Sequence, residues 1–400
     1  MVGANQQVDL ADVASDWQPT GMFGDIPVSE PVERALSAMG YVDPSPIQTM
    51  VAPHLLEGRD LVGQAQTGTG KTSAFGIPII ESIKGEIARP GSPLAVVLCP
   101  TRELAVQVSA ELTKLGAYAG VKPLAVYGGQ AMSVQLDALQ AGAQIVVATP
   151  GRLMDHMERR TIDLQEVRMV ILDEADQMLD IGFADDIERI LRRTPKSRQT
   201  ALFSATMPGP IKYLSRRYLN NPEWCRVGEE SQTVDLVDQI YFEVASQDRQ
   251  PALRELLKDP DDMTQALVFR RTKIGVDKLV WYLQREGYDA EAIHGDMTQS
   301  HRERTIKRFR EKNLRVLIAT NVAARGLDIP AVSHVVNYDM PDNLEEYVHR
   351  IGRTARMGRE GTAYLFVSDI DDFDMLETIR NHVGEDHISK RRLDFLYGDS

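Results

Sequence analysis

The sequence predicts an α/β protein that contains parallel sheets with helices packed on their faces. One observation is a series of short apolar runs without polar alternation, which is typical of strands buried on both faces of a parallel sheet. The other is that longer amphipathic segments lie between these runs, as in successive βαβ units. The predicted strands form two sets along the chain: Leu94–Cys99, Gln144–Ala148, Met169–Leu172 and Ala201–Phe203, and then Ala266–Phe269, Val316–Ala319, Val332–Asn337 and Thr362–Val367.

Two of the intervening segments have the spacing of helices. Residues 102–115 carry apolar side chains at intervals of three and four, which places them on one helical face. These side chains are Leu104, Val108, Leu112 and Leu115. Residues 302–312 are charged and amphipathic, so a second helix is predicted there.

A gap in the pattern separates the two sets of strands. Asn221-Pro222 opens the gap, and residues 228–233 are polar and poor in apolar side chains, which indicates a linker. The predicted organisation is an N-terminal arm (1–21), a first domain (22–221), a linker (222–240), a second domain (241–384) and a short C-terminal tail (385–400).

The composition excludes several classes of protein. The chain has 400 residues, of which 43% are hydrophobic and 26% charged, and these fractions exclude a mainly disordered protein. No apolar stretch reaches the length of about 18 residues that a membrane span needs. Residues 1–7 lack the basic and apolar regions of a signal peptide, so a cytoplasmic location is expected. Two cysteines, Cys99 and Cys225, are too few for a disulfide framework or a four-cysteine zinc site.

The charge balance is acidic but uneven. The formal net charge of −13 excludes a protein that coats nucleic acid by bulk electrostatics. Basic side chains are nevertheless concentrated in residues 302–315 and 349–359, whereas residues 1–50 and 369–377 are acidic. A local basic groove is therefore compatible with the composition.

Residues 65–72 predict a phosphate-binding loop. Ala65-Gln66-Thr67-Gly68-Thr69-Gly70-Lys71-Thr72 follows the short apolar step Leu61-Val62 and fits the P-loop pattern, with Ala65 in place of its first glycine. Small residues let backbone N–H groups wrap phosphates at a helix N-terminus. Lys71 is then expected at the β- and γ-phosphates and the Thr72 hydroxyl on Mg²⁺. The alternative is a glycine-rich turn with an exposed lysine.

An acidic strand end supplies the second half of such a site. Asp173, Glu174 and Asp176 come directly after the apolar run Met169–Leu172, and crowded carboxylates are costly without a nearby cation. Asp173 is predicted to hold Mg²⁺ through water, and Glu174 is placed to accept a proton from the attacking water. A solvated acidic turn is the alternative.

Together with the P-loop, the sequence Asp173-Glu174-Ala175-Asp176 resembles the DEAD-box family of ATP-dependent RNA helicases of superfamily 2, over roughly residues 23–365. The resemblance implies two tandem RecA-like domains, each a mostly parallel sheet flanked by helices, with a nucleotide cleft between them. Phe23, Gly40-Tyr41 and Pro44–Gln48 look like the family's adenine-reading motif. Gln48 would then bond the adenine edge, since an amide can pair with N6 and N7 together, and Tyr41 would stack near it.

The resemblance assigns further roles by motif. Residues expected to bind ATP are Phe23, Tyr41, Gln48, Gln66, Thr67, Gly68, Thr69, Gly70, Lys71, Thr72, Gly326 and Asp328, the last at the ribose. Residues expected to couple the ATP state to strand separation are Asp176, Ser204, Thr206 and His349. Residues expected to bind RNA are Pro100, Thr101, Arg102, Gly129, Thr149, Gly151, Arg152, Arg270, Gly295, Arg302 and Thr320.

Arg353 and Arg356 match the family's arginine-finger motif. Two arginines three positions apart share a helical face, and their guanidinium forks suit the charge that develops on a γ-phosphate. Three positions depart from the family pattern: Ala65 and Ala355 stand for glycines, and Asn321 stands for the usual aspartate. None of them removes a group with a predicted chemical role.

The sequence therefore predicts RNA-stimulated ATP hydrolysis, with ATP and Mg²⁺ as cofactors, coupled to closure of two lobes on single-stranded RNA. Local, non-processive unwinding of short duplexes with low sequence selectivity is expected, from a monomeric core without membrane contact. One alternative is an ATP-gated RNA clamp or annealing factor, which multiple-turnover strand displacement would distinguish. The other is a DNA-directed motor or a generic P-loop ATPase, which stimulation by DNA as well as RNA would favour.

Overall fold

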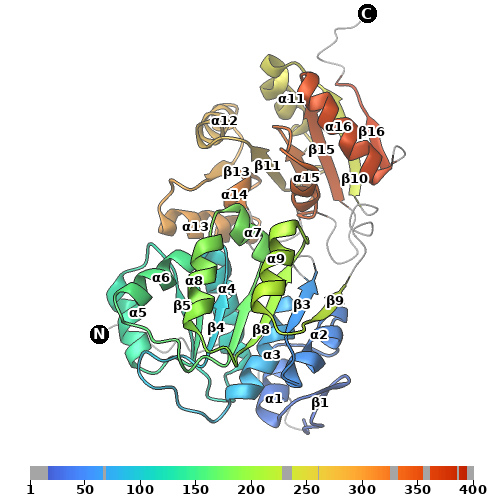
Figure 1. Ribbon diagram of the computed structural model, residues 1–400. Coiled ribbons are helices and arrows are strands. Elements are labelled where there is room, and N and C mark those ends of the chain that lie inside the picture. The colour runs from blue at the N-terminus through green and yellow to red at the C-terminus, as the bar shows by residue number, and fades with distance from the viewer. Residues whose placement is uncertain are drawn as a thin grey trace, which may run out of the picture. The chain divides into compact units, whose positions relative to one another are not determined.

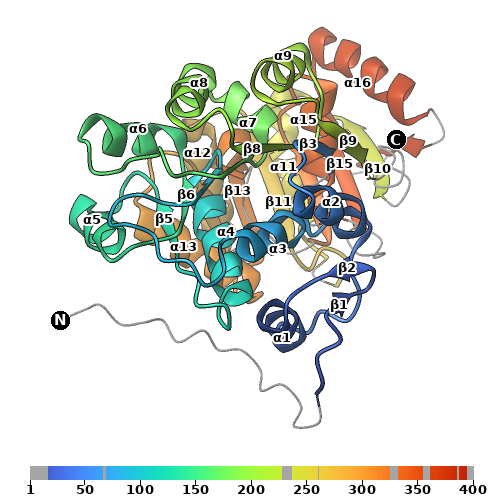
Figure 2. The ribbon, with the colours of Figure 1, turned by 60° about the horizontal axis from the view of Figure 1, so that its bottom comes forward.

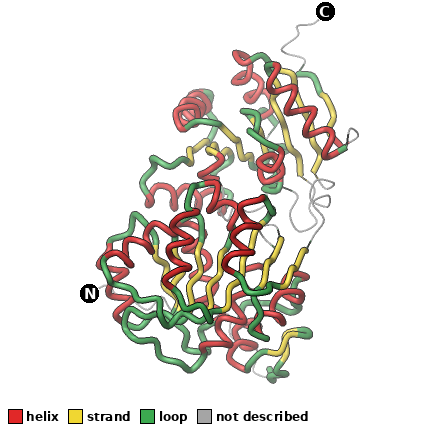
Figure 3. The backbone as a smooth tube through the Cα atoms, viewed as in Figure 1, coloured by secondary structure: helices red, strands yellow, loops and turns green. Residues whose placement is uncertain are grey.

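The computed structural model describes residues 17–65, 69–227, 237–259, 261–324, 332–354, 361–384 and 387–393. The chain divides into two compact units, Met1–Gly228 and Glu229–Ser400, and each contains a seven-stranded sheet (Figures 1 and 3). Within the described residues, every pairing in these two sheets is parallel. The predicted α/β class with parallel sheets is therefore confirmed.

The sheet of the first unit has the strand order β5-β6-β4-β7-β8-β3-β9. Its strands are β3 (Leu61–Gln64), β4 (Ala95–Leu98), β5 (Pro123–Val126), β6 (Ile145–Ala148), β7 (Met169–Leu172), β8 (Gln199–Ser204) and β9 (Glu223–Arg226). A separate antiparallel hairpin, β1 (Met22–Phe23) and β2 (Ile26–Pro27), precedes the sheet.

Helices cover both faces of this sheet (Figure 2). Along β4, Ala95 and Val97 belong to one hydrophobic cluster and Val96 and Leu98 to another, so both faces are buried, as the apolar runs predict. The first cluster also contains side chains from α1 (Glu30–Ala38), α2 (Pro46–Leu56), α3 (Lys71–Ile83) and α4 (Arg102–Leu115). The second cluster contains side chains from α5 (Met132–Gln140), α6 (Pro150–Glu158), α7 (Ala175–Asp180), α8 (Ala184–Arg193) and α9 (Gly209–Tyr218). Full burial of each Val or Leu contributes about 1.5–3 kcal/mol.

The sheet of the second unit has the order β12-β13-β11-β14-β15-β10-β16. Its strands are β10 (Val237–Glu243), β11 (Ala266–Arg270), β12 (Ala290–Ile293), β13 (Val316–Thr320), β14 (His334–Asn337), β15 (Gly361–Val367) and β16 (Ile388–Lys390). Its helices are α11 (Arg249–Leu256), α12 (Lys273–Arg285), α13 (Gln299–Arg310), α14 (Asn321–Ala324), α15 (Leu344–Ile351) and α16 (Ile370–Val383), with a 3₁₀ turn at Ser246–Asp248.

The structure corrects the predicted boundaries of the linker, of the C-terminal tail and of one helix. Strand β9 and the first residues of β10 lie inside the predicted linker, and β16 lies inside the predicted tail. Both β9 and β16 are edge strands that bury a single side chain, Cys225 and Ile388 respectively, so neither shows a continuous apolar run. Helix α13 begins at Gln299 rather than 302, because the Thr298 hydroxyl caps it by accepting from the His301 N–H at 3.4 Å.

No described helix is both long enough and apolar enough to cross a membrane.

Candidate nucleotide and RNA sites

The residues predicted to bind nucleotide and RNA in the first unit follow the carboxyl ends of its strands. Strands β3, β7 and β8 are followed by the P-loop, Asp173 and the turn after Ser204, and these strands lie in one half of the sheet. Strands β5, β6 and β4 occupy the other half and precede the predicted RNA-contact loops. Ligands of open α/β sheets bind at this edge, so the strand order places the two predicted sites side by side.

The described part of the P-loop has the geometry of a helix N-terminus that can receive phosphate. Gly70 has a φ of 92° and precedes α3, which begins at Lys71. The Lys71 side chain is buried, and its Nζ donates to the Ala65 carbonyl at 3.1 Å. Thr72 follows in the first turn of α3. The predicted ATP-binding residues Gln66, Thr67 and Gly68 lie outside the described residues.

Gln48 contacts the P-loop directly. Its Nε2 donates to the Gly70 carbonyl at 3.2 Å, and its Oε1 accepts from the Ser45 N–H at 2.8 Å in the capping box of α2. The Ser45 hydroxyl donates to the Thr69 carbonyl at 2.9 Å. A Cβ at Gly70 would lie 2.7 Å from Gln48 Nε2, so this approach requires glycine. The contacts use one N–H and one lone pair of the Gln48 amide, and they leave one of each for a ligand.

Phe23 and Tyr41 lie near each other beside this loop, with ring centroids 6.5 Å apart. The Tyr41 hydroxyl is 3.5 Å from Ser73 Oγ, which in turn donates to Glu111 Oε1 at 2.7 Å. Burial raises the pKa of Glu111, although its hydrogen bonds oppose the shift. Burial, and then the nearby Glu111, raise the pKa of Tyr41. Glu111 is therefore a half-buried acid with a raised pKa beside the predicted adenine site.

Asp173 and Glu174 follow β7 as predicted, and both are buried. Asp173 donates its backbone N–H to the Leu98 carbonyl at 2.9 Å, and Glu174 has a φ of 51°. Burial raises the pKa of Asp173, whereas the positive charge of Lys71 lowers it. Among the described residues, Asp173 Oδ1 has no hydrogen-bond partner. A buried carboxylate oxygen of this kind fits a site for a hard divalent cation.

The carboxylate of Asp176 ties the end of β7 to the turn after β8. Its Oδ2 accepts from the backbone N–H groups of Ala205 and Thr206 at 3.1 and 3.0 Å, and from the Thr206 hydroxyl at 3.0 Å. Ser204 ends β8 and is buried. The structure therefore brings three of the four predicted coupling residues together in the first unit.

Pro100, Thr101 and Arg102 follow β4 at the other half of the edge. Thr101 caps α4 by accepting from the Leu104 N–H at 3.3 Å. Gly129 has a φ of 93°, and a Cβ there would lie 2.5 Å from Arg102 Nη1. The glycine therefore lets the loop after β5 pack against the Arg102 guanidinium.

Thr149, Gly151 and Arg152 lie at the N-terminus of α6, after β6. A Cβ at Gly151 would meet nothing within 4 Å, so no contact inside the described unit requires glycine there. Arg152 Nη1 donates to the Gln130 carbonyl and to Gln135 Oε1, each at 3.1 Å. Buried groups of the first unit therefore fix the direction of the Arg152 side chain.

In the second unit, the predicted RNA contacts gather at the carboxyl edge of neighbouring strands. Arg270 ends β11, Thr320 ends β13 and Gly295 follows β12. Arg302, on α13, donates through Nη2 to the Ala323 carbonyl at 3.0 Å. The Arg270 guanidinium is engaged within the unit, since it lies 4.4 Å above the Tyr338 ring and pairs with Asp339.

His349 lies in α15, and Arg353 follows this helix with only 5% of its surface exposed. Three predicted residues of this unit, Gly326, Asp328 and Arg356, lie outside the described residues.

Sequence reasoning missed the residues that hold the predicted ones in place. Glu111, Gln135, His156 and Asp339 contact predicted site residues or their neighbours, and each is buried or half-buried. Asp339 follows a predicted strand, which is a signal that could have been used. Glu111, Gln135 and His156 lie inside helices, where their types are common on solvated faces.

Two family models match the chain, DEAD/DEAH box helicase at residues 45–214 and Helicase conserved C-terminal domain at residues 248–358. The chain is 48% identical to the DEAD-box ATP-dependent RNA helicase CshA of Bacillus subtilis (strain 168) over 348 residues, which cover 86% of this chain and 69% of that protein. It is 46% identical to CshA of Bacillus licheniformis over 374 residues, which cover 93% of this chain and 74% of that protein. Among relatives of this kind the matched share of the relative ranges from 64% to 74%.

Solved structures give the same result. S. cerevisiae Dbp5 bound to RNA and ADP BeF3 matches with a TM-score of 0.81 and 34% identity over 92% of this chain and 95% of that chain. Mss116p bound to ssRNA and AMP-PNP matches with a TM-score of 0.80 and 28% identity over 92% of this chain and 78% of that chain. The two sheets are thus the cores of two RecA-like domains, and the chain belongs to the DEAD-box family of ATP-dependent RNA helicases.

Proposed function

We propose that this chain hydrolyses ATP in an RNA-stimulated reaction and uses the ATP cycle to close two RecA-like domains on single-stranded RNA and unwind short duplexes locally. The observation that carries the proposal is that the P-loop and the acidic strand end both lie at the carboxyl edge of one parallel sheet, after β3 and β7. The side chains of Lys71 and Asp173 are both buried; burial raises the pKa of Asp173, and the positive charge of Lys71 opposes this shift, which supports their being close together.

Mg²⁺ fits this edge. Asp173 and the Thr72 hydroxyl would hold it, the first through water, and the buried Oδ1 atom of Asp173 supports this assignment. The ion would supply charge neutralisation at the β- and γ-phosphates. Gln48 would read adenine with the N–H and lone pair that its contacts to Gly70 and Ser45 leave over.

Glu174 would accept a proton from the attacking water, since its buried carboxylate is next to the proposed metal ligand Asp173 in the sequence. Arg353 and Arg356 would stabilise charge on the γ-phosphate, and Asp328 would hold the ribose. RNA would contact the loop and helix ends after β4, β5 and β6 in the first unit and after β11, β12 and β13 in the second. Such contacts are to the backbone, so sequence selectivity is expected to be low.

The test measures ATP hydrolysis with and without single-stranded RNA, and strand displacement of a short RNA duplex. Lys71→Ala is expected to lower kcat/KM for ATP at least about 100-fold, as loss of a preorganised electrostatic group does. Lys84→Ala is the matched control, since Lys84 is an exposed lysine at the other end of α3. Normal turnover by Lys71→Ala would refute the nucleotide site. Hydrolysis without strand displacement would identify an RNA clamp, and equal stimulation by DNA would identify a less selective motor.

A cytoplasmic location is part of the proposal. The two cysteines, Cys99 and Cys225, are free and buried, which suits a reducing compartment.

A further inference from the structure

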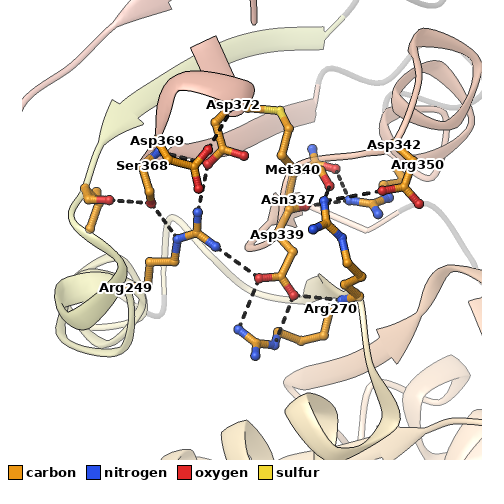
Figure 4. Close-up of polar contacts among 12 residues, drawn as sticks. Arg249, Arg270, Asn337, Asp339, Met340, Asp342, Arg350, Ser368, Asp369 and Asp372 are labelled. Atoms are coloured by element: carbon orange, nitrogen blue, oxygen red, sulfur yellow. Dashed lines mark hydrogen bonds and ion pairs between the residues drawn. The ribbon is translucent and has the colours of Figure 1, made fainter. Parts of the chain in front are cut away.

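Asp339 holds the end of β11 in the second unit. It follows β14, the neighbour of β11 in the sheet. Its Oδ2 accepts from the Arg271 backbone N–H at 2.7 Å, and its Oδ1 accepts from Arg270 Nη1 at 3.3 Å. Figure 4 shows this carboxylate between the Arg270 and Arg249 guanidinium groups. The proposed RNA contact at the end of β11 therefore rests on Asp339.

The backbone of the same residue holds α15. The Asp339 carbonyl accepts from Arg350 Nη1 at 2.9 Å, and Arg350 lies on α15 with 2% of its surface exposed. The Arg350 guanidinium also forms an ion pair with Glu346 and lies 4.9 Å from the centroid of the Phe269 ring. Arg350 therefore contacts both the residue before Arg270 and the residue that binds Arg270.

Arg249, the first residue of α11, fixes the orientation of the Asp339 carboxylate. Its Nη1 donates to Asp339 Oδ1 at 3.1 Å, its Nη2 to Asp372 Oδ2 at 2.9 Å, and its Nε to the Ser368 hydroxyl at 2.8 Å. The side chains of Arg249 and Asp339 are 12% and 15% exposed. Charge-assisted hydrogen bonds between such shielded groups are stronger than bonds on the surface.

We propose that Asp339 is a positioning residue that couples RNA contact at the end of β11 to the placement of α15, the helix that precedes the proposed finger Arg353. This inference rests on the proposed function. A phosphate that approaches Arg270 or the Arg271 backbone competes with the Asp339 carboxylate for the same donors. Any resulting shift of Asp339 reaches Arg350 through the Asp339 carbonyl, without passing through another side chain.

The test measures this coupling as a ratio. The dissociation constant of a fluorescent single-stranded RNA is determined without nucleotide and with a nonhydrolysable ATP analogue, and their quotient is the coupling factor. Asp339→Asn is expected to lower the coupling factor by more than twofold and by up to about 30-fold, since single residues modulate coupling between sites over about 2- to 30-fold. Asp372→Asn is the matched control, because Asp372 binds the same Arg249 but hydrogen-bonds to neither β11 nor Arg350 within the described residues. Its coupling factor is expected within about twofold of the wild type.

Three outcomes decide the inference. An unchanged coupling factor in Asp339→Asn overturns it, and so does an equal loss in both variants, which would mean that the residue only stabilises the fold. If Asp339→Asn does not fold, Arg249→Lys replaces it, because a lysine cannot bind Asp339, Asp372 and Ser368 at once; loss of coupling then supports the inference, and full coupling overturns it. A wild-type protein whose RNA affinity does not respond to nucleotide would instead refute the proposed function.

Discussion

The Thr206 hydroxyl donates to Asp176 Oδ2 at 3.0 Å. The same oxygen accepts the Thr206 backbone N–H at 3.0 Å, so a single carboxylate atom holds the turn that leads from β8 into α9. Asp176 lies three residues after Asp173, at the proposed metal site. Because Asp176 is the second residue of α7, only Glu174 and Ala175 lie between the proposed metal ligand and the residue that holds this turn.

Removal of the Thr206 hydroxyl should separate hydrolysis from unwinding. Thr206→Val keeps the side-chain shape and loses the bond to Asp176, which is worth about 1.5–3 kcal/mol for a charged acceptor. We expect strand displacement to fall about tenfold or more while RNA-stimulated ATP hydrolysis falls much less. Both rates are measured on the same preparation, with Thr206→Ser as the control that retains the hydroxyl. A parallel loss of both activities would contradict a coupling role.

Substitution of Glu174 should slow the chemical step and spare binding. Glu174→Gln preserves the size of the side chain and leaves Asp173 in place, but it cannot accept a proton. The rate constant for hydrolysis in a single turnover is expected to fall about 10²- to 10⁴-fold, with ATP and RNA affinities near those of the wild type. Asp180→Asn, at the end of the same helix α7, serves as the control for a change of charge. Normal single-turnover hydrolysis by Glu174→Gln would assign the base elsewhere.

Gln135 should stabilise the first unit, because both N–H groups and both lone pairs of its side-chain amide have hydrogen-bond partners. Its Nε2 donates to the Tyr127 carbonyl and to Gln130 Oε1, each at 2.9 Å, while its Oε1 accepts from Arg152 Nη1 and His156 Nε2. Gln135→Ala leaves several of these buried groups unpaired, so we expect a loss of about 2–4 kcal/mol in the free energy of unfolding.

RNA affinity of Gln135→Ala should also fall, since Arg152 loses its support. Gln140→Ala, on the exposed side of the same helix, should change stability by less than about 0.5 kcal/mol. Urea denaturation and RNA titration measure the two effects. Equal free energies of unfolding for the two variants would show that the hydrogen bonds of Gln135 do not stabilise the first unit.

His156 should make the first unit less stable in mild acid. Burial, and then the positive charge of Arg152, lower the pKa of His156 below its usual 6.5. The folded protein therefore holds a neutral imidazole, while the unfolded chain binds a proton between the lowered pKa and 6.5. The stabilising contribution is complete above about pH 6.5 and is lost as the pH falls through the lowered pKa.

The melting temperature of the wild type should accordingly drop more from about pH 7 to about pH 5 than that of His156→Gln, which has no titrating group at this position. An identical pH dependence in both proteins would exclude His156 as the source.

The sequence predicted strands β4, β6, β7, β8, β11, β13, β14 and β15, and it missed the edge strands of the two sheets together with β3 and β10. Strands such as β4 and β6 are buried on both faces, so every side chain is apolar and the run is visible. Edge strands β9 and β16 bury one residue each, and nothing in their composition distinguishes them from loops. The hairpin β1–β2 is too short to show any period.

The residues of the candidate site also fall into a group that the sequence predicted and a group that it missed. Lys71, Asp173 and Asp176 belong to compact motifs whose members lie a few residues apart, and the structure places them as predicted beside strands β3 and β7. The supporting residues pair over long separations: Asp339 binds Arg249 across 90 residues and Gln135 binds His156 across 21. Such pairs depend on the tertiary fold, so one sequence cannot reveal them.

The backbone hydrogen bond from the Asp173 N–H to the Leu98 carbonyl joins the ends of β7 and β4. It therefore sets the distance between the proposed metal site and the proposed RNA-binding loop of the first domain. Adjacent strands of a sheet are about 4.8 Å apart. Leu98 ends β4, and Pro100 and Thr101 of the proposed RNA surface follow it after Cys99. The proposed metal-binding carboxylate and the proposed RNA-binding loop are therefore separated by one strand spacing. In the proposed function, the metal ion and the RNA bound by the first domain would therefore both lie at the ends of the paired strands β4 and β7.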